Sequence, residues 1–180
     1  MKDISMHILD ILQNSVSAGA KHIQVIVYES VLENILSVAI KDDGKGMTNE
    51  EVERVTDPFY TTRTTRKVGL GIPLFKQSAL QSGGTLSIDS EPGTGTQIKA
   101  TFIHNNIDRP PLGDIANVFV LTLSSNPQAD FILKYIYEGK EYRFDSEEVK
   151  KVLEGVPLYE PAVIKALTEM ISENINDLRS

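Results

Sequence analysis

The residues of this sequence that are suited to binding a phosphorylated ligand occur in five short segments of its first hundred positions. They are Asn14, D-D-G-K-G at 42–46, D-P-F-Y-T-T-R at 57–63, G-L-G at 69–71 and G-T-G-T at 93–96. Glycine lets a backbone approach a ligand closely, amide oxygens bind Mg²⁺, and arginine binds phosphate. A P-loop is not supported because GxxxxGK[ST] is absent, and G-L-G-I-P-L at 69–74 lacks the third glycine of a dinucleotide fingerprint. Neither P-loop nor Rossmann chemistry is therefore supported, and any one of the five segments alone is a weak signal.

Two polar side chains are expected on one face of an N-terminal helix. Asp10 lies four residues before Asn14, so the two side chains are one helical turn apart. The amide oxygen of Asn14 is a hard ligand that suits an octahedral Mg²⁺ shell shared with phosphate oxygens and water. The alternative is a structural role, in which the Asn14 amide only bridges the helix and a neighbouring sheet.

Asp42 ends an expected strand, where a partly buried carboxylate can accept a charge-assisted hydrogen bond from an exocyclic amine. The alternative is an ordinary aspartate in a turn. Gly44 and Gly46 follow, and they allow the backbone to pass close to a flat ring. Gly69 and Gly71 lead into a helix, whose free N–H groups and dipole favour anions, so this helix start is the expected phosphate site.

The segment between residues 56 and 69 has no hydrophobic periodicity, and it gathers Arg63, Arg66 and Lys67 with four threonines. This composition suits a mobile lid that folds over a triphosphate. A solvated basic loop is the alternative interpretation of the same residues.

In their order and spacing, the five segments resemble the N, G1, F, G2 and G3 boxes of the GHKL (Bergerat-fold) ATPases. This superfamily includes histidine kinases, gyrase-type topoisomerases, heat-shock chaperones and mismatch-repair ATPases. The resemblance covers about residues 4–104. It implies an α+β fold, a two-layer sandwich of a mixed sheet with helices on one face, and ATP with Mg²⁺ as the ligands.

The resemblance also assigns roles to residues. Asn14 would hold the Mg²⁺ ion, Asp42 would bind the adenine amine, and Thr96 would lie near Asp42. The full set of nucleotide-binding residues that the resemblance implies is Asn14, Asp42, Gly44, Gly46, Met47, Phe59, Thr61, Thr62, Arg63, Arg66, Lys67, Gly69, Leu70, Gly71 and Thr96.

The resemblance indicates the ligand more clearly than it indicates the reaction. Family members that hydrolyse ATP or phosphorylate serine commonly have a glutamate general base at the position of Asp10, whereas histidine kinases usually have a non-acidic residue there. Asp10 is thus a candidate general base, although aspartate is one methylene shorter than glutamate. The segment N-S-V-S-A-G-A-K at 14–21 resembles the mismatch-repair version of the N box.

Three functions follow as alternatives. The first is a histidine-kinase-like domain that transfers phosphate to a partner protein in trans, because almost no chain precedes Asn14 and an internal phosphoacceptor helix is not expected. The second is an ATP-hydrolysing conformational switch. The third is a binding module without catalysis that senses nucleotide and captures a partner, as anti-sigma proteins do.

The composition argues against some classes of binding partner. The chain has 180 residues, with 18 Lys+Arg against 25 Asp+Glu and a net charge of −7, which opposes a general electrostatic affinity for nucleic acid or anionic membranes. The absence of cysteine excludes disulfides and thiolate metal sites. No signal peptide or transmembrane stretch is apparent, so a cytoplasmic protein is expected, with its oligomeric state left open.

The elements that must position these residues follow from periodicity. A helix is predicted from Ile4 to about Gly19, and a capping box of Thr48 and Glu51 starts a short helix. A further helix is predicted over 70–82, before Gly83-Gly84. Strands are predicted at 23–28, 35–40, 85–89 and 97–102.

The prolines and glycine of 105–114 predict a connecting loop between an ATP-binding domain over 1–104 and an extension over 115–180. In the extension we expect a strand at 118–123, a hairpin of strands at 131–137 and 141–144, a short helix after Ser146 and a long amphipathic helix from Pro161. The aromatic residues of the hairpin are expected in the core: Tyr135, Tyr137, Tyr142 and Phe144.

Overall fold

The N-terminal helix α1 (Ile4–Ser17) forms where the hydrophobic spacing predicts it. The computed structural model of the chain describes residues 2–57 and 70–180. The side chain of Asp3 accepts a hydrogen bond from the Met6 N–H and caps the start of the helix. Ile4, Ile8 and Leu12 are buried on one stripe, so α1 packs this stripe on the sheet and presents its polar face outward.

Strands β1 (His22–Ser30) and β2 (Ile35–Asp42) pair antiparallel, as do β3 (Leu86–Glu91) and β4 (Gly95–Ile103). In β1 the alternate residues Ile23, Val25 and Val27 are buried, and in β2 the same holds for Leu36, Val38 and Ile40. This period of two places one face of the sheet in the core. The strands predicted in the first half of the sequence are therefore confirmed.

Two helices frame the segment between β2 and β3. Helix α2 (Asn49–Val55) starts with the predicted capping box, because the Thr48 side chain accepts from the Glu51 N–H and the Glu51 side chain accepts from the Thr48 N–H. Helix α3 (Gly71–Gln81) has Pro73 in its first turn and is followed by Gly83 at a φ of 76°. Both predicted helices are confirmed to within two residues at their ends.

The strand predicted at 118–123 is wrong. Residues Ile115–Ser125 form helix α4, and the Asp114 side chain caps it by accepting from the Asn117 N–H at 3.0 Å. Val118, Phe119 and Val120 are all buried because α4 packs between α1 and α6 as well as on the sheet. A helix buried on several sides loses the polar stripe that identifies a helix, and the β-branched content then favours a strand prediction.

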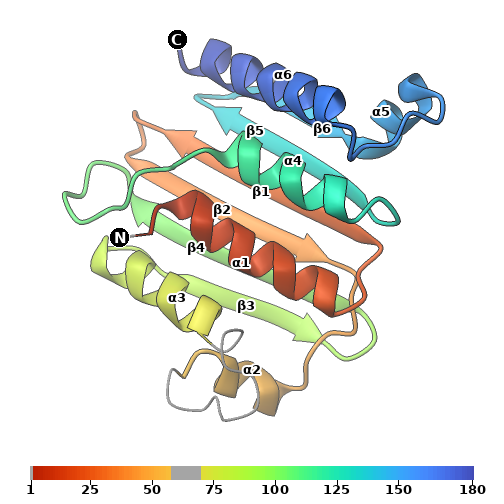
Figure 1. Ribbon diagram of the computed structural model, residues 1–180. Helices are drawn as coiled ribbons and strands as arrows, with labels where there is room; N and C mark the ends of the chain where they lie inside the picture. The colour runs from red at the N-terminus through yellow and green to blue at the C-terminus, as the bar shows by residue number, and fades with distance from the viewer. Residues whose placement is uncertain (1, 58–69) are drawn as a thin grey trace.

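The chain ends with β5 (Asp130–Tyr137), β6 (Lys140–Asp145), α5 (Ser146–Leu153) and α6 (Pro161–Arg179). Strand β5 pairs parallel with β1 and antiparallel with β6, and β2 pairs antiparallel with β4. Three hairpins thus form one mixed six-stranded sheet in the order β3-β4-β2-β1-β5-β6. Helices α3, α1, α4 and α6 lie side by side over one face of this sheet (Figure 1). The predicted α+β sandwich with helices on one face is confirmed.

The aromatic residues of the C-terminal hairpin belong to the core, as expected. Tyr135 and Phe144 are fully buried, and Tyr137 and Tyr142 pack against the same cluster. Phe119 of α4 contacts the ring of Phe144 edge-on at a centroid distance of 5.6 Å. The hairpin and α4 thus share a single core with the rest of the sheet.

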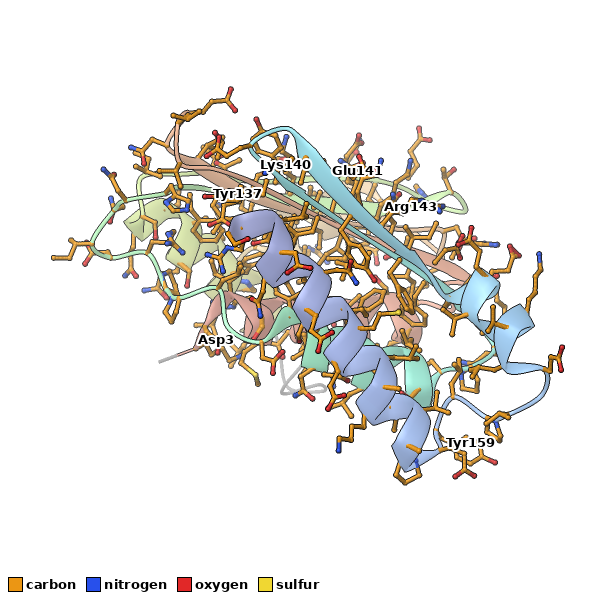
Figure 2. The ribbon with its side chains drawn as sticks, turned by 90° about the horizontal axis from the view of Figure 1, so that it is seen from above. Asp3, Tyr137, Lys140, Glu141, Arg143 and Tyr159 are labelled. Atoms are coloured by element: carbon orange, nitrogen blue, oxygen red, sulfur yellow. The ribbon has the colours of Figure 1, made fainter. Side chains whose placement is uncertain are left out.

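A buried carboxylate attaches the last helix to the middle of the sheet. Glu29 of β1 is 2% exposed and accepts hydrogen bonds from the Tyr135 hydroxyl at 2.6 Å and from His104 Nε2 at 2.8 Å. Arg179 of α6 donates from Nη2 to Glu29 Oε2 at 3.2 Å, and its Nε lies 2.9 Å from Glu29 Oε1 in an ion pair. Figure 2 shows α6 lying across the sheet beside β6, the strand that carries Glu141 and Arg143.

Within the described ranges, none of the helices has the length and apolar character needed to cross a lipid bilayer.

Candidate functional site

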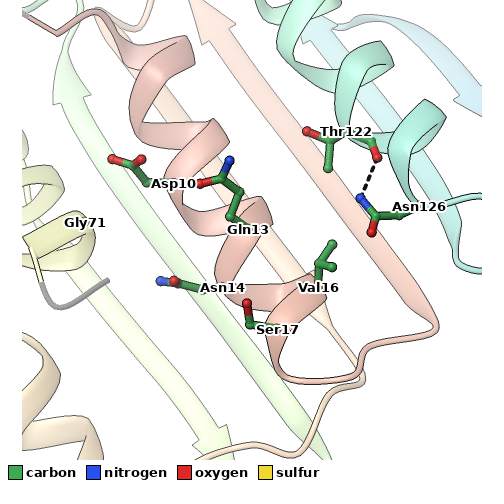
Figure 3. A pocket seen from close by; sticks show the side chains of 8 residues that line it. All are labelled: Asp10, Gln13, Asn14, Val16, Ser17, Gly71, Thr122 and Asn126. Carbon is green, nitrogen blue, oxygen red and sulfur yellow. Dashed lines mark hydrogen bonds between the residues drawn. The ribbon is translucent and has the colours of Figure 1, made fainter. Parts of the chain in front are cut away.

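The outward face of α1 forms the floor of a cavity of about 450 Å³ between α3 and α4. This volume lies within the usual range for small-molecule sites, roughly 300–1,000 Å³. Figure 3 shows Asp10 and Asn14 on the side of α1 nearer Gly71, with Thr122 and Asn126 across α1 on α4. The lining residues are Asp10, Gln13, Asn14, Val16, Ser17, Gly71, Thr122 and Asn126.

Asn14 faces this cavity with an uncommitted side chain. Within residues 2–57 and 70–180, its amide makes no hydrogen bond. The structural alternative, in which the amide bridges the helix and a neighbouring sheet, would need such a bond. The Asn14 oxygen is therefore available to a ligand, and its chemistry fits a Mg²⁺ ion bound together with phosphate oxygens.

Asp10 lies one turn before Asn14, and one of its two carboxylate oxygens is already bonded within the protein. One carboxylate oxygen, Oδ2, accepts a hydrogen bond from Lys2 Nζ at 2.6 Å in an ion pair whose side chains are 40% and 28% exposed. The start of α3 lies directly against the same side chain, since a Cβ atom added to Gly71 would be 3.2 Å from Asp10 Cβ. Asp10 and Gly71 thus border the cavity in close contact.

Asp42 lies at the end of β2 with its carboxylate already oriented. Ser15 of α1 donates its hydroxyl to Asp42 Oδ2 at 2.6 Å, and the Gly44 N–H donates to Oδ1 at 2.8 Å. Each oxygen keeps a second lone pair, so the carboxylate can still accept from an amine. Because Ser15 follows Asn14 on α1, the Asp42 group and the cavity share one helical turn.

The loop after Asp42 is closely packed. A Cβ atom at Gly44 would lie 2.8 Å from Ala18 Cβ, and one at Gly46 would lie 1.9 Å from the Glu91 carbonyl oxygen. Gly46 also has a φ of 73°, which favours glycine. The two glycines therefore allow close contacts within the protein, and neither lines the cavity.

Strand β4 contributes Thr96, which pairs with Asp42 across the ladder. Its hydroxyl lies 2.8 Å from that of Ser90, and the Ser90 hydroxyl also accepts the Met47 N–H at 2.8 Å. Met47 and Thr96 are both half-buried. The structure therefore brings Asp42, Met47 and Thr96 together at one end of the sheet, where Ser90 connects Met47 and Thr96.

No described side chain caps the N-terminus of α3, and Leu70, which precedes the helix, is 45% exposed. Pro73 has no N–H, so Gly71 and Ile72 supply the N–H groups of the first turn. Such groups and the helix dipole favour an anion at a helix start. The other predicted lid and phosphate residues lie outside the described residues: Phe59, Thr61, Thr62, Arg63, Arg66, Lys67 and Gly69.

Some site residues could not be selected from the sequence. Ser15 and Ser90 orient Asp42 and Thr96, yet serine is common and neither occurs in a distinctive motif. Gln13 and Ser17 follow from helical spacing, since they lie three residues from Asp10 and Asn14, respectively. Thr122 and Asn126 of α4 were concealed by the strand prediction for that segment.

Comparison with known proteins gives the family that the first part of the chain matches. The model of the family described as "Histidine kinase-, DNA gyrase B-, and HSP90-like ATPase" matches residues 2–106. Sporulation kinase C of Bacillus subtilis is 30% identical over 88 residues, which is 49% of this chain and 20% of the relative. Sensor histidine kinase WalK of Bacillus subtilis is 31% identical over 105 residues, or 52% of this chain and 17% of the relative. The chain thus spans a fifth or less of the length of these two relatives.

A solved structure shares the fold. The ATPase domain of MutL from Aquifex aeolicus, described as a complex with ADP, superposes with a TM-score of 0.51 at 16% sequence identity. The match covers 86% of this chain and 70% of the MutL chain, so it extends beyond the residues that the family model matches.

Proposed function

The chain belongs to the histidine kinase-, DNA gyrase B- and HSP90-like ATPase family, and on that premise we propose that it binds Mg-ATP and transfers phosphate to a partner protein. One observation carries the proposal: Asn14, Asp10 and Gly71 line one cavity, and Ser15, next to Asn14, holds Asp42. Metal-binding, phosphate-binding and base-binding groups are thereby gathered around a single helical turn.

In this proposal each group has a separate role in binding. Asp42 accepts a hydrogen bond from the adenine amine, while the N–H groups at the start of α3 bind the phosphates. Asn14 contributes an oxygen to Mg²⁺, which supplies charge neutralisation during phosphoryl transfer. Arg63 and Arg66 are proposed to contact the phosphates from the preceding segment.

The acceptor is proposed to be a side chain of another protein. The chain has three histidines, and none of them lines the cavity. His7 is buried against α3, His22 is paired with Asp43 at 2.7 Å, and His104 is bonded to Glu29. The two sequence relatives are named as kinases, and this also supports a protein acceptor.

Calorimetric titration tests nucleotide binding. We expect ATP to bind more tightly than GTP, because Asp42 accepts from an amine and would face the carbonyl oxygen of guanine. Mg²⁺ should strengthen ATP binding to the unsubstituted chain, and Asn14→Ala should remove most of this strengthening. The matched control is Asn174→Ala, a half-buried residue of α6 outside the cavity, whose amide donates to the Met170 carbonyl at 2.8 Å. Absence of ATP binding to the unsubstituted chain would refute the proposal.

Radiolabelled ATP then tests the reaction. Transfer predicts that label moves from the γ-phosphate to a candidate partner protein carrying an acceptor side chain. Release of free phosphate with no label on protein would contradict transfer.

The cavity also favours a second candidate function, an ATP-hydrolysing switch. The Asp10 carboxylate lies in the cavity one turn from Asn14, where a general base could activate water, and the fold match includes a MutL ATPase domain. In that case, phosphate release without any acceptor protein should be lost in Asp10→Asn. Release that is indifferent to this substitution would leave transfer as the better proposal.

A further inference from the structure

His7 of α1 is a buried side chain with only half of its polar groups satisfied. It is 2% exposed, and its Nε2 lies 3.0 Å from the Ser78 hydroxyl of α3. Its Nδ1 is buried and has no hydrogen-bond partner in the described part of the protein. An unsatisfied buried nitrogen is unfavourable for stability, so a leucine or phenylalanine would be the simpler choice for packing alone.

All of the specific contacts of the His7 ring are with α3. The ring stacks on Phe75 at a centroid distance of 5.0 Å and an interplanar angle of 15°. Phe75 and Ser78 are three residues apart and therefore lie on one face of α3. Stacking restricts the tilt of α3 over α1, and the directional bond to Ser78 restricts sliding and rotation.

A second contact fixes the same helix pair at its other end. Asp10 follows His7 by three residues, and Gly71, the first residue of α3, lies against Asp10 so closely that an added Cβ would be 3.2 Å away. The positions of the α3 N-terminus and of the α1 polar face are thus set by two neighbouring contacts on α1. Loss of the His7 contact would leave α3 held at Gly71 and by apolar packing alone.

We propose that His7 is a positioning residue, which places the start of α3 at the distance from Asn14 that binding of the ATP phosphates requires. This inference rests on the proposed function. The unsatisfied nitrogen is then the stability cost of a directional contact, because no apolar side chain of similar size can bond to Ser78.

The charge state of His7 is compatible with this role. Burial lowers the pKa of His7, and the positive charge of Lys2 lowers it further, against the opposite effects of Asp10 and Asp3. The ring is therefore neutral at neutral pH, with one donor and one acceptor nitrogen. A serine hydroxyl can satisfy either form of Nε2.

The test separates nucleotide affinity from stability. His7→Phe keeps an aromatic ring on Phe75 and removes the unsatisfied nitrogen, so its melting temperature should equal or exceed that of the unsubstituted chain. Its affinity for ATP should fall roughly three- to tenfold, as expected for the loss of one neutral hydrogen bond. A residue that only supports packing would show affinity and stability changing together.

A second variant approaches the bond from α3. Ser78→Ala should weaken ATP binding by the same factor as His7→Phe while lowering the melting temperature, because His7 then has no partner at all. The double variant should bind ATP no more weakly than either single variant. The matched control is Gln77→Ala, the exposed neighbour of Ser78 on α3, which should bind ATP normally.

Helix position provides a readout without nucleotide. The ¹H–¹⁵N signal of Gly71 should shift in both single variants relative to the unsubstituted chain and to the Gln77→Ala control. The inference is overturned if either single variant binds ATP within twofold of the unsubstituted chain. Failure of the unsubstituted chain to bind ATP would instead refute the proposed function, so the two failures are distinguishable.

Discussion

At the scale of single residues, the polar groups of the site differ in how far they are prepared for a ligand. Asp42 is held by Ser15 and by the Gly44 N–H, so its carboxylate needs little reorientation to accept another donor. The Asn14 amide is unbonded among the described residues and can still rotate. In the proposed function, the carboxylate that binds the adenine amine is thus preorganised, whereas the amide that binds Mg²⁺ would become ordered with the ion.

Substitution of Asp42 tests its proposed role in binding the adenine amine. Asp42→Asn keeps the shape of the side chain but removes the charge that strengthens a hydrogen bond to the adenine amine. We expect ATP binding to weaken by about 1.5–3 kcal/mol, measured by calorimetry. The control is Asp43→Asn, whose carboxylate bonds to His22 and to the Lys21 and His22 N–H groups, outside the site. Equal ATP affinity in the two variants would contradict the assignment of Asp42.

The sequence allowed candidate residues with unusual chemistry to be selected, but not the residues that bond to them. Asn14 and Asp42 occur in distinctive spacings with glycines, and those spacings survive as local geometry. Ser15 and Ser90 could not be selected because their partners are 27 and 43 positions away along the chain, for Asp42 and Met47 respectively. The partner of Ser15 depends on how α1 packs on β2, and the partners of Ser90 depend on the register of β3 with β4; local pattern specifies neither.

At the scale of elements, the locally encoded features were predictable and the packing-dependent ones were not. The Thr48 capping box and the glycine stop after α3 depend on residues a few positions apart, and both are confirmed. Helix α4 was predicted as a strand because its apolar residues face α1, α6 and the sheet together. Its burial, and so its hydrophobic pattern, is set by neighbours from three distant segments.

The loop after β2 offers a test of how tightly backbone segments pack at the site. Gly46 and Gly93 have similar φ values of 73° and 80°, but an added Cβ would lie 1.9 Å from the Glu91 carbonyl oxygen at Gly46 and would meet nothing within 4 Å at Gly93. We expect Gly93→Ala to lower the unfolding free energy by about 1–2 kcal/mol, the cost of a left-handed alanine. Gly46→Ala should lower it further, since the backbone must also move.

Urea unfolding of the two variants measures the comparison. The difference between them isolates the steric overlap, because the conformational cost is common to both. Equal destabilisation would show that the loop can move away from Glu91 without loss, and that the contact does not constrain the site.

At the scale of the whole molecule, Glu29 connects four segments that are distant in sequence: β1, the end of β4, β5 and α6. Burial alone would raise the pKa of Glu29, but hydrogen bonds from Tyr135 and His104 and the charge of Arg179 lower it below its usual value. The ionised form is thus favoured in the folded state, and its contribution to stability depends on pH.

The sign of this dependence follows from the lowered pKa. The contribution of Glu29 is fully present above its unfolded-state pKa of about 4.5 and is lost as the pH falls through the lower folded-state pKa. Glu29→Gln should therefore reduce the unfolding free energy by about 1.5–3 kcal/mol at pH 7 and by less near pH 4. Urea unfolding at the two pH values measures the change.

The control for Glu29→Gln is Glu173→Gln, the same substitution at an exposed residue of α6. This control should change the unfolding free energy little at either pH. A deficit in Glu29→Gln that is equal at both pH values would show that the charge of Glu29 does not contribute to stability.

The parallel pairing of β1 with β5 has a practical consequence for protein engineering. A shortened chain that stopped at residue 104 would retain most of the family-matched region, yet it would strip one side of β1 of its hydrogen-bonding neighbour. A bare strand of alternating valine and isoleucine invites sheet-to-sheet aggregation between molecules. The minimal soluble nucleotide-binding unit should therefore be sought beyond β6, after residue 145.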